Sequence, residues 1–395
     1  MGRIVVTGIG IISAIGSSVE SNRLALQKGL CGITTVELFK TRYAALLPFG
    51  EIKLSNEFLK QQLHVDAVNV TRTSLLAQHA FEQAIADSAL SQDEITSFDT
   101  AFINGSTVGG MCCTDELYQD ANRISNSSPY VTSYDLASVT LYLQELYNMQ
   151  GVCNTINTAC SSSANAIMYG ARLIKQGKAK RAIVGGVDSL AKFTINGFNS
   201  LHILSAEKCK PFDRNRSGLN LGEAAAFLVL EAEEDCKDKK AYAVLSGYAN
   251  ANDAYHASAL SETGDGPYEA MKEALHIANL DPSEISFINA HGTGTENNDL
   301  AESAALKRIF NSPPPFASTK ANTGHTLGAA AAIEAVYSIL SLKYQELYPA
   351  INFQAPIEET ELTPLQAFEK THVKHVMSNS FGFAGNCSSL IFSAL

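Results

Sequence analysis

Short runs of β-branched and other apolar residues alternate with longer helix-like segments along the whole chain, and this alternation limits the possible folds more than any other feature. Glycine, asparagine or aspartate bounds most of the short runs, which is typical of buried strands in an α/β protein. The strands expected in the first part of the chain cover residues 3–7, 100–104, 153–157, 181–187 and 225–231. Those expected in the second part cover residues 241–248, 284–290, 316–319, 375–379 and 389–392.

Two long segments of the chain repeat the same local plan. Residues 153–174 and residues 315–340 each contain an apolar run, a turn and a helix-like segment that opens with small residues. Such a repeat predicts an internal duplication. We expect one half over residues 1–240 and the other over 241–395, joined by the charged stretch 231–240, which should be solvated.

Composition and charge narrow the possible functions. The 395 residues carry a formal net charge of −11 and are 46% hydrophobic, so we expect a globular protein that binds neither nucleic acid nor a membrane. Glu334 interrupts the longest apolar stretch, residues 326–342, and the N-terminus lacks the apolar core of a signal peptide. The cysteines have neither CxxC nor zinc-site spacing, so we expect reduced thiols, no metal site and a cytoplasmic protein.

Cys160 is the strongest candidate nucleophile. It follows an expected strand and directly precedes the helix-like residues 161–175, within the sequence TACSSS. A sulfur there would lie beside unpaired N–H groups at the positive end of the helix dipole, which would lower its pKa and favour the thiolate. A thiolate in that position accepts acyl groups efficiently, so we expect covalent catalysis.

Two histidines occupy junctions of the same kind. His291 follows an expected strand at the start of HGTGT, and His325 precedes the longest helix rich in small residues. Because ligand sites in open α/β sheets lie at the carboxyl ends of the strands, Cys160, His291 and His325 are expected to converge at one edge. Lys320 lies on the turn before His325, and Glu334, within the apolar helix, needs a partner that Lys320 could supply.

A glycine-rich loop precedes the last expected strand. It contains Phe381 and Phe383 in the sequence SNSFGFAGN. Flexible backbone N–H groups in such a loop can bind an oxyanion, and an aromatic ring can cover the site. We therefore expect this loop to border the reactive groups.

Taken together, these motifs resemble those of the β-ketoacyl-acyl carrier protein synthases, the condensing enzymes of the thiolase-like fold, over essentially the whole chain. Five motifs stand in that family's order: TACSSS around Cys160, KPFDRNRSGLNLGEAAAFLVLE at 210–231, HGTGTENNDLAE at 291–302, STKANTGHTLGAAAAIEA at 318–335 and SNSFGFAGN at 378–386. The resemblance implies a duplicated βαβαβαββ core in five layers, αβαβα. It also implies a working dimer, either a homodimer or a ketosynthase heterodimer.

The resemblance further implies a role for each candidate residue. Cys160 would carry the acyl chain, and His291 with His325, the pair characteristic of the elongating class, would bind a malonyl thioester and stabilise the enolate left by its decarboxylation. The N–H groups of Cys160 and Phe383 would hold the tetrahedral oxyanion. The other implied roles are pantetheine contact by Thr293 and Thr295, lining of the acyl pocket by Val108 and Met111, and positioning of the histidines by Lys320, Glu334, Asp299 and Glu302.

The reaction implied by the resemblance is a decarboxylative Claisen condensation that lengthens a fatty-acid, polyketide or polyene chain by two carbons. The partner would be an acyl carrier protein, and no dissociable cofactor would be needed, because phosphopantetheine arrives on the carrier. Carrier proteins are acidic, so docking to this acidic chain would need a local basic patch. The candidates for that patch are Lys208, Lys210, Arg214, Arg216 and Arg72.

Three departures from the family's pattern suggest an unusual acyl pocket. GFAGNC stands where GFGGTN is usual, so Ala384 and Cys387 replace a glycine and an asparagine. RSGL at 216–219 replaces RDGF, and the segment 135–152 replaces the family's Asn-Met dimer-interface segment. These changes would suit a specialised acyl chain or a different partner subunit.

Three other functions stay open on the sequence alone. A non-catalytic subunit of the chain-length-factor type would keep the fold without the nucleophile, whereas Cys160 and both histidines are present here. A thiolase or hydroxymethylglutaryl-CoA-type synthase would need a second catalytic cysteine, and Cys387 lies behind the C-terminal loop. A cysteine hydrolase would need only the cysteine and a histidine.

Overall fold

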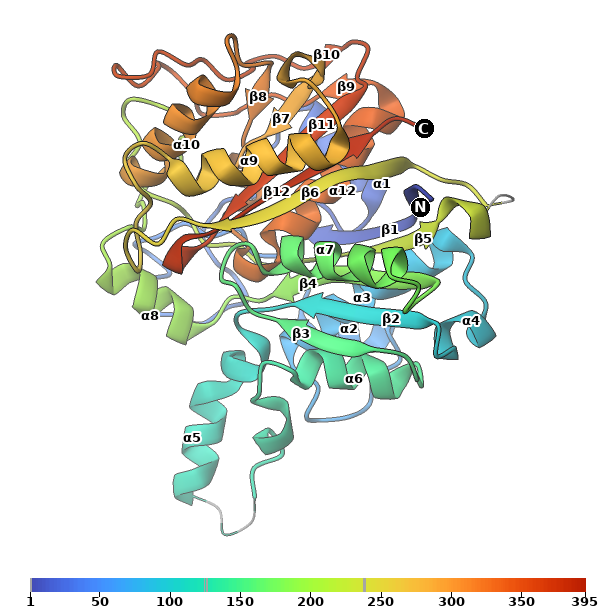
Figure 1. The fold of residues 1–395 in the computed structure, drawn as a ribbon. Coiled ribbons are helices and arrows are strands. Elements are labelled where there is room, and N and C mark those ends of the chain that lie inside the picture. Colours follow the sequence, from blue (N-terminus) through green and yellow to red (C-terminus); the bar gives the residue numbers. More distant parts are fainter. Residues whose placement is uncertain (1, 124, 126, 237–238) are drawn as a thin grey trace.

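A ten-stranded sheet forms the centre of the protein, in the order β3-β2-β4-β5-β1-β6-β12-β11-β7-β8 (Figure 1). The computed structural model describes residues 2–123, 125, 127–236 and 239–395. The strands are β1 (Ile4–Ser13), β2 (Thr100–Gly105), β3 (Cys153–Ile156), β4 (Arg181–Asp188), β5 (Ala224–Ala232), β6 (Ala243–Asn252), β7 (Phe287–Asn289), β8 (Phe316–Ala317), β11 (His375–Phe381) and β12 (Asn386–Ser393), with β9 (Glu346–Leu347) and β10 (Glu369–Lys370) in a separate pair.

The helices connect these strands and cover both sides of the sheet. The α-helices are α1 (Val19–Gln27), α2 (Asn56–Gln62), α3 (Arg72–Ser88), α4 (Gln92–Thr96), α5 (Thr114–Arg123), α6 (Ser138–Leu146), α7 (Ser162–Lys175), α8 (Lys192–Ser200), α9 (Asp265–Ala278), α10 (Glu296–Ile309), α11 (Lys320–Thr323) and α12 (Ala330–Tyr344). The 3-10 helices are η1 (Gly109–Cys113), η2 (Val131–Ser133), η3 (Glu233–Asp235), η4 (Pro282–Glu284), η5 (Leu327–Ala329) and η6 (Phe383–Gly385).

The strand order shows that the chain is internally duplicated. The first half has the order β3-β2-β4-β5-β1, and the second half repeats it in reverse, with β6, β7, β8, β11 and β12 in the places of β1 to β5. The halves join through β1 and β6, where only Val5 with Val244 and Val6 with Ala243 are paired. The predicted duplicated α/β architecture is therefore confirmed.

The two halves of the sheet lie on opposite sides of the central helices α7 and α12, which gives the fold five layers (Figure 1). Helices α3 and α6 pack on the outer side of the first-half strands, and α9 packs on the outer side of the second-half strands with α10 beside it. Helices α7 and α12 contact each other in the middle, and α12 contacts strands of both halves. This central pair places the start of α7 and the start of α12 close together.

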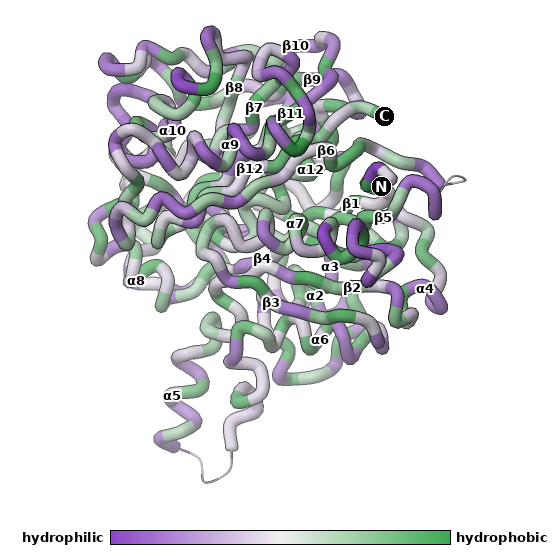
Figure 2. The backbone as a smooth tube through the Cα atoms, in the orientation of Figure 1, coloured by the Kyte–Doolittle hydropathy of each residue, from purple (hydrophilic) through white to green (hydrophobic). Residues whose placement is uncertain are grey.

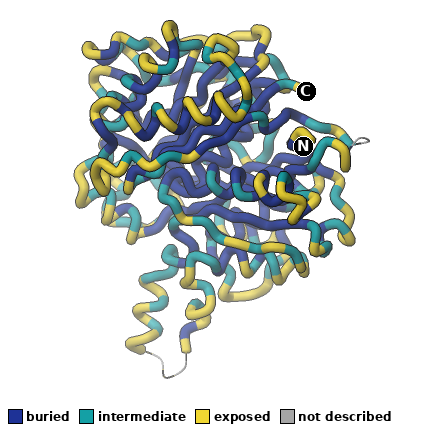
Figure 3. The backbone as a smooth tube through the Cα atoms, in the orientation of Figure 1, coloured by how far each residue is buried: buried dark blue, intermediate teal, exposed yellow. Residues whose placement is uncertain are grey.

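Helix α12 is buried on every side, which explains its apolar sequence. Among the described residues, the stretch Leu327–Tyr344 is the one long and apolar enough to cross a membrane by length and composition, yet 89% of it is buried inside the protein. The segment that Figure 2 colours as hydrophobic at α12 is coloured as buried in Figure 3. Its hydropathy is therefore accounted for by the central layer of the fold.

Three local expectations need correction. The strand expected at 284–290 covers only Phe287–Asn289, because Asp281 caps the 3-10 turn η4 that precedes it. Glu231, expected in the solvated connection, is 1% exposed in β5 and accepts a hydrogen bond from Thr7 Oγ1 at 2.6 Å. Lys320 begins the short helix α11 instead of lying on a turn. Residues 237–238 of the connection lie outside the described residues.

Candidate active site

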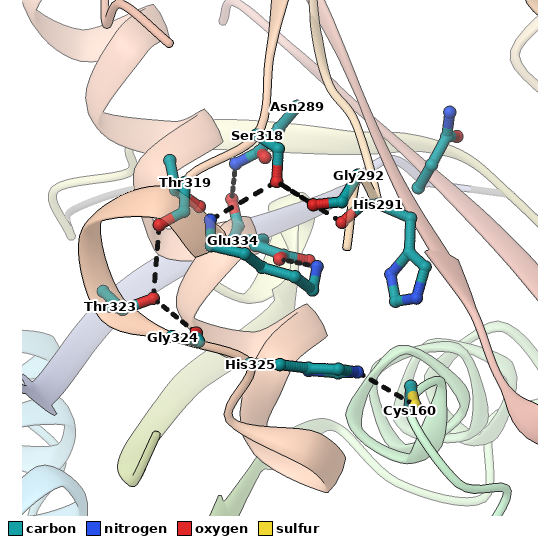
Figure 4. Close-up of polar contacts among 12 residues, drawn as sticks. Cys160, Asn289, His291, Gly292, Ser318, Thr319, Thr323, Gly324, His325 and Glu334 are labelled. Carbon is teal, nitrogen blue, oxygen red and sulfur yellow. Dashed lines mark hydrogen bonds and ion pairs between the residues drawn. The ribbon is translucent and has the colours of Figure 1, made fainter. Parts of the chain in front are cut away.

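Three reactive side chains meet where strands of both halves end (Figure 4). Cys160 lies between β3 and α7, His291 follows β7, and His325 lies between α11 and η5. Ala159 adopts a left-handed conformation, with φ 53°, which turns the chain sharply just before Cys160. The Cys160 Sγ and one nitrogen from each ring lie within 4.8 Å of one another, and all three residues are buried.

The hydrogen bonds of His325 fix the position of its ring proton. Its Nδ1 accepts the backbone N–H of Leu327 at 3.2 Å, so the proton of the neutral ring is on Nε2. Nε2 lies 3.1 Å from Cys160 Sγ and therefore donates to the sulfur. Sulfur and imidazole donors would also suit Zn²⁺. The short Sγ–Nε2 contact, however, is that of a proton-mediated hydrogen bond.

The second imidazole lies beside the first without sharing its partners. The rings of His291 and His325 are 5.5 Å apart between centroids and nearly perpendicular. The His291 Nδ1 has no hydrogen-bond partner among the described residues. His291 also lines the cavity that contains Cys160, so its ring is placed to bind a polar group that enters this cavity.

Burial controls the charge of all three groups. It lowers the pKa of both histidines well below the usual value, and the positive charge of Lys320 lowers it further, so both rings are neutral at pH 7. Burial raises the pKa of the Cys160 thiol to about 11, although Lys320 and backbone N–H groups act in the opposite direction. The expectation that the helix N-terminus makes Cys160 a thiolate by itself is therefore wrong.

Lys320 and Glu334 form an ion pair behind the histidines. Lys320 Nζ lies 2.5 Å from Glu334 Oε1, and both side chains are almost fully buried. Burial raises the pKa of Glu334, and Lys320 lowers it in part. The backbone carbonyl of Glu334 accepts a hydrogen bond from Asn289 Nδ2 at 3.4 Å, so this pair also contacts the strand that leads to His291 (Figure 4).

Two buried carboxylates hold the loop that begins with His291. Glu302 accepts the backbone N–H of His291 at 2.9 Å and that of Gly292 at 2.8 Å. Asp299 accepts the N–H of Gly294 at 3.2 Å and that of Phe212 at 2.7 Å. Both residues lie on α10, so this helix fixes the position of the loop and of the imidazole.

Backbone N–H groups and aromatic rings surround the sulfur. The N–H groups of Cys160 and Phe383 face the Cys160 sulfur and lower the pKa of the thiol. The Phe383 ring stacks on Phe198 of α8, with centroids 5.7 Å apart. Phe381 belongs to β11 instead of the loop, and its ring packs edge-on against His291 at 5.6 Å. The rings therefore limit how far the Phe383 loop can move.

A cavity of about 330 Å³ opens onto these groups, and Thr293 and Thr295 are on its wall. Their hydroxyl oxygens lie 2.8 Å apart. Val108 and Met111, expected on an acyl pocket, are not on this wall. Val108 is buried in an apolar cluster with Leu190 and other residues, and Met111 lines a second cavity.

Most residues of the expected basic patch are held by acidic neighbours. The ion pairs are Arg72–Glu223, Lys210–Glu207 and Arg214–Glu358. The Arg72 side chain is only 13% exposed, so it is not a docking residue. Arg216 donates to the carbonyl oxygens of Thr295 and Glu296 and lies on the wall of the Cys160 cavity.

Two residues that the sequence did not single out tie the site together. Asp188 accepts the backbone N–H groups of Thr107 and Gly328, so it joins the end of β2 to the start of α12. Asp188 directly follows the apolar run AIVGGV, and this position at the end of an expected strand could have marked it as a candidate site residue. Asn386 accepts the Ser161 hydroxyl at 2.7 Å, a contact between residues 225 positions apart that the sequence pattern does not reveal.

Cys387 is separated from the reactive cluster. It is the second residue of β12, is fully buried and packs in a small apolar cluster. Burial raises the pKa of its thiol. A second catalytic cysteine, as a thiolase would need, is therefore not supplied by Cys387.

Comparisons with known proteins agree over the full length of the chain. The N-terminal domain of beta-ketoacyl synthases matches residues 1–236, and the C-terminal domain matches residues 242–354. The 3-oxoacyl-[acyl-carrier-protein] synthase 2 of Vibrio harveyi is 32% identical over 422 residues, covering 100% of this chain and 99% of that protein. The mitochondrial 3-oxoacyl-[acyl-carrier-protein] synthase of Arabidopsis thaliana is 31% identical, covering 100% and 93%.

A solved structure has a closely similar fold. The ishigamide ketosynthase/chain length factor superposes with a TM-score of 0.93 at 28% identity. The similarity covers 100% of this chain and 99% of that one. Both comparisons therefore extend across the two halves and not just around the reactive cluster.

Proposed function

Because the chain belongs to the beta-ketoacyl synthase family, we propose that it catalyses decarboxylative condensation of a malonyl thioester with an acyl chain held on Cys160. The observation that carries the proposal is the meeting of one cysteine with two neutral imidazoles in a single cavity. A non-catalytic subunit of the chain-length-factor type does not need a cysteine and two histidines in this arrangement. The catalytic function is therefore favoured.

The first step transfers an acyl group from a carrier thioester to Cys160. The sulfur attacks the acyl carbon, the carbonyl oxygen becomes an oxyanion, and the departing pantetheine thiol takes up the proton that Cys160 loses. The N–H groups of Cys160 and Phe383, which face the sulfur, are placed to stabilise that oxyanion. The Nε2–H of His325, 3.1 Å from the sulfur, stabilises the developing thiolate.

The second step removes carbon dioxide from a malonyl thioester. The bond to the carboxylate carbon breaks, and its electron pair moves toward the thioester oxygen to give an enolate. Two neutral rings that donate hydrogen bonds to this oxygen stabilise the enolate without protonating it. Burial, and after it the positive charge of Lys320, keeps the pKa of both rings low, which preserves that neutral donor form at pH 7.

The last step forms the new carbon–carbon bond. The enolate carbon attacks the acyl carbon on Cys160, and the same N–H groups hold the second oxyanion. Its collapse expels the Cys160 thiolate and leaves a chain longer by two carbons on the carrier. Phosphopantetheine takes part as the arm of the substrate, and Thr293 and Thr295 on the cavity wall are the proposed contacts for it.

The proposed partners are an acyl carrier protein and a second subunit of the same fold. The name of the Vibrio harveyi relative includes the carrier protein, and the ishigamide structure is described as a ketosynthase with a chain length factor. These names support a carrier-bound substrate and a homodimer or heterodimer as the working unit. All eight cysteines are free thiols, which supports a reducing compartment such as the cytoplasm.

Release of carbon dioxide from malonyl-carrier protein tests the proposal. The wild-type protein should release it and, when an acyl-carrier is also present, form the longer product. Cys160→Ala should abolish condensation without unfolding the protein, and Cys160→Gln should lose condensation but keep decarboxylation, because both rings remain. A protein that releases only free fatty acid from the acyl-carrier, and no carbon dioxide, would be a hydrolase and would contradict the proposal.

A further inference from the structure

The second cavity of the described chain holds a pair of adjacent cysteines. It measures about 400 Å³, and its wall includes residues of α2, α3, η1 and α5. Cys112 and Cys113 end η1, both are partly exposed, and their sulfur atoms lie 3.8 Å apart. Neither Cys160 nor His291 or His325 is on this wall, so the pair is outside the condensing site.

The surroundings of Cys112 stabilise a thiolate. The Thr73 hydroxyl donates to its sulfur at 3.6 Å, and that hydroxyl is in turn 2.7 Å from the Ser189 hydroxyl. The backbone N–H of Thr73, in the first turn of the 17-residue helix α3, also faces the sulfur. Hydrogen bonding from the Cys113 thiol, together with these donors, lowers the pKa of Cys112, whereas hydrogen bonding with Cys112 and burial raise the pKa of Cys113.

The two thiols are thus chemically unequal, which is the condition for a two-step oxidation. The Thr73 donors face the Cys112 sulfur, so Cys112 is the nucleophile, and Cys113 is the neighbouring thiol that can react with it afterwards. Low-pKa thiols that are accessible and lie next to a second cysteine are the ones that react selectively with oxidants. The cavity gives a small oxidant access to both sulfur atoms.

We propose that Cys112 and Cys113 form a reversible oxidation site, at which a hydroperoxide oxidises Cys112 and Cys113 then closes a disulfide. The Cys112 thiolate attacks one peroxide oxygen, the O–O bond breaks, and an alcohol or water leaves, which gives a sulfenic acid on Cys112. The Cys113 sulfur attacks that sulfur, the S–O bond breaks, and water leaves with the Cys113 proton. The two thiols supply the two electrons that reduce the peroxide.

The covalent geometry makes this disulfide easy to reduce. Adjacent Cα atoms are about 3.8 Å apart, below the usual separation of ~4.4–6.8 Å across a disulfide, so the ring is strained. Strained disulfides have more oxidising potentials and are the labile ones. Helix α5, which directly follows Cys113, has no buried residue, so the chain on that side can adjust when the bond forms.

Peroxide titration with cysteine mapping tests this site directly. Reduced wild-type protein is treated with a few equivalents of hydrogen peroxide at neutral pH, alkylated, digested and measured by mass spectrometry. The peptide with Cys112 and Cys113 should lose two hydrogens before any other cysteine is oxidised, and dithiothreitol should restore both thiols. Cys153 is the internal comparator, because it is also partly exposed but burial raises its pKa to about 11.

Two single variants separate the roles of the thiols. In Cys113→Ser, the serine hydroxyl replaces the Cys113 thiol as a donor to Cys112 but cannot close a disulfide, so dimedone should trap a sulfenic acid on Cys112. Cys112 should still be alkylated faster than Cys153 at neutral pH, because the Thr73 donors remain. In Cys112→Ser, neither the sulfenic acid nor the fast alkylation should occur. Oxidation of Cys153 or Cys31 at the same peroxide dose as the pair, or no disulfide in the wild type, would overturn the proposal. These readouts do not depend on condensing activity.

Discussion

Removal of the His325 ring should slow both acyl transfer and decarboxylation, whereas removal of the His291 ring should slow decarboxylation alone. In the described chain, His325 Nε2 is hydrogen-bonded to Cys160 Sγ at 3.1 Å, and its Nδ1 is fixed by the Leu327 N–H. His291 makes no such bond to the sulfur among the described residues. His325→Ala thus removes a donor from the thiolate and from the enolate, and His291→Ala removes one from the enolate only.

The magnitudes follow from the groups that lose a donor. Loss of one preorganised donor to a developing oxyanion costs about 2.7–4 kcal/mol, so decarboxylation should fall ~10²–10³-fold in either variant. A hydrogen bond to a charged group contributes about 1.5–3 kcal/mol, so acylation should fall ~10–150-fold in His325→Ala. In His291→Ala, acylation should change by less than about threefold, because the sulfur keeps its donors.

Two assays on the same variants separate the steps. Intact-protein mass spectrometry after rapid quenching follows acyl transfer from an acyl-carrier, and carbon dioxide release from malonyl-carrier follows decarboxylation. His202→Ala is the matched control, since His202 is also on the cavity wall but forms no part of the reactive cluster. Equal loss of acylation in both histidine variants, or full acylation by His325→Ala, would refute the reasoning.

Three further perturbations test the groups that support the reactive cluster. Lys320→Met should lower the free energy of unfolding by about 3–5 kcal/mol, because it leaves Glu334 buried without its ion partner. The double variant Lys320→Met with Glu334→Met should recover much of that loss, as measured by urea unfolding. Phe198→Ala should slow acylation ~2–10-fold, since it removes a stacking partner that contributes about 0.5–1.5 kcal/mol, while Phe193→Ala on the same helix, 61% exposed, should leave the rate unchanged. Carbon dioxide release by Cys160→Gln should stay constant from pH 8 to below 6.5, because burial lowers the pKa of both rings and keeps them neutral there; a fall with an apparent pKa at or above 6.5 would contradict this.

The sequence predicts the meeting of the reactive groups well because it follows from strand ends. Cys160 and His291 each lie just after a strand, and His325 lies in the connection from β8 to α12, after the short helix α11. Such connections gather at one edge of an α/β sheet. The buried partner of Glu334 was also predictable, since a carboxylate within an apolar helix needs a cation.

The properties that depend on burial or on distant contacts were not predictable from the sequence. The helix N-terminus suggested a low pKa for Cys160, but desolvation, which depends on the whole packed fold, is the larger effect. The sequence context of Arg72 indicated an exposed charge, yet its guanidinium pairs with Glu223, which is 151 residues away in the sequence. Local sequence patterns contain neither kind of information, because both arise from how segments far apart in the sequence pack together.

Transfer of a labelled acyl chain through Cys160 tests the central claim most directly. The protein is first acylated with a labelled acyl-carrier, and the site is mapped by peptide mass spectrometry before malonyl-carrier is added. The account predicts that the label is on Cys160 and that, after the addition, it leaves Cys160 and is found in a chain two carbons longer on the carrier. A label on another residue, or its release as the unextended free acid, would contradict the account.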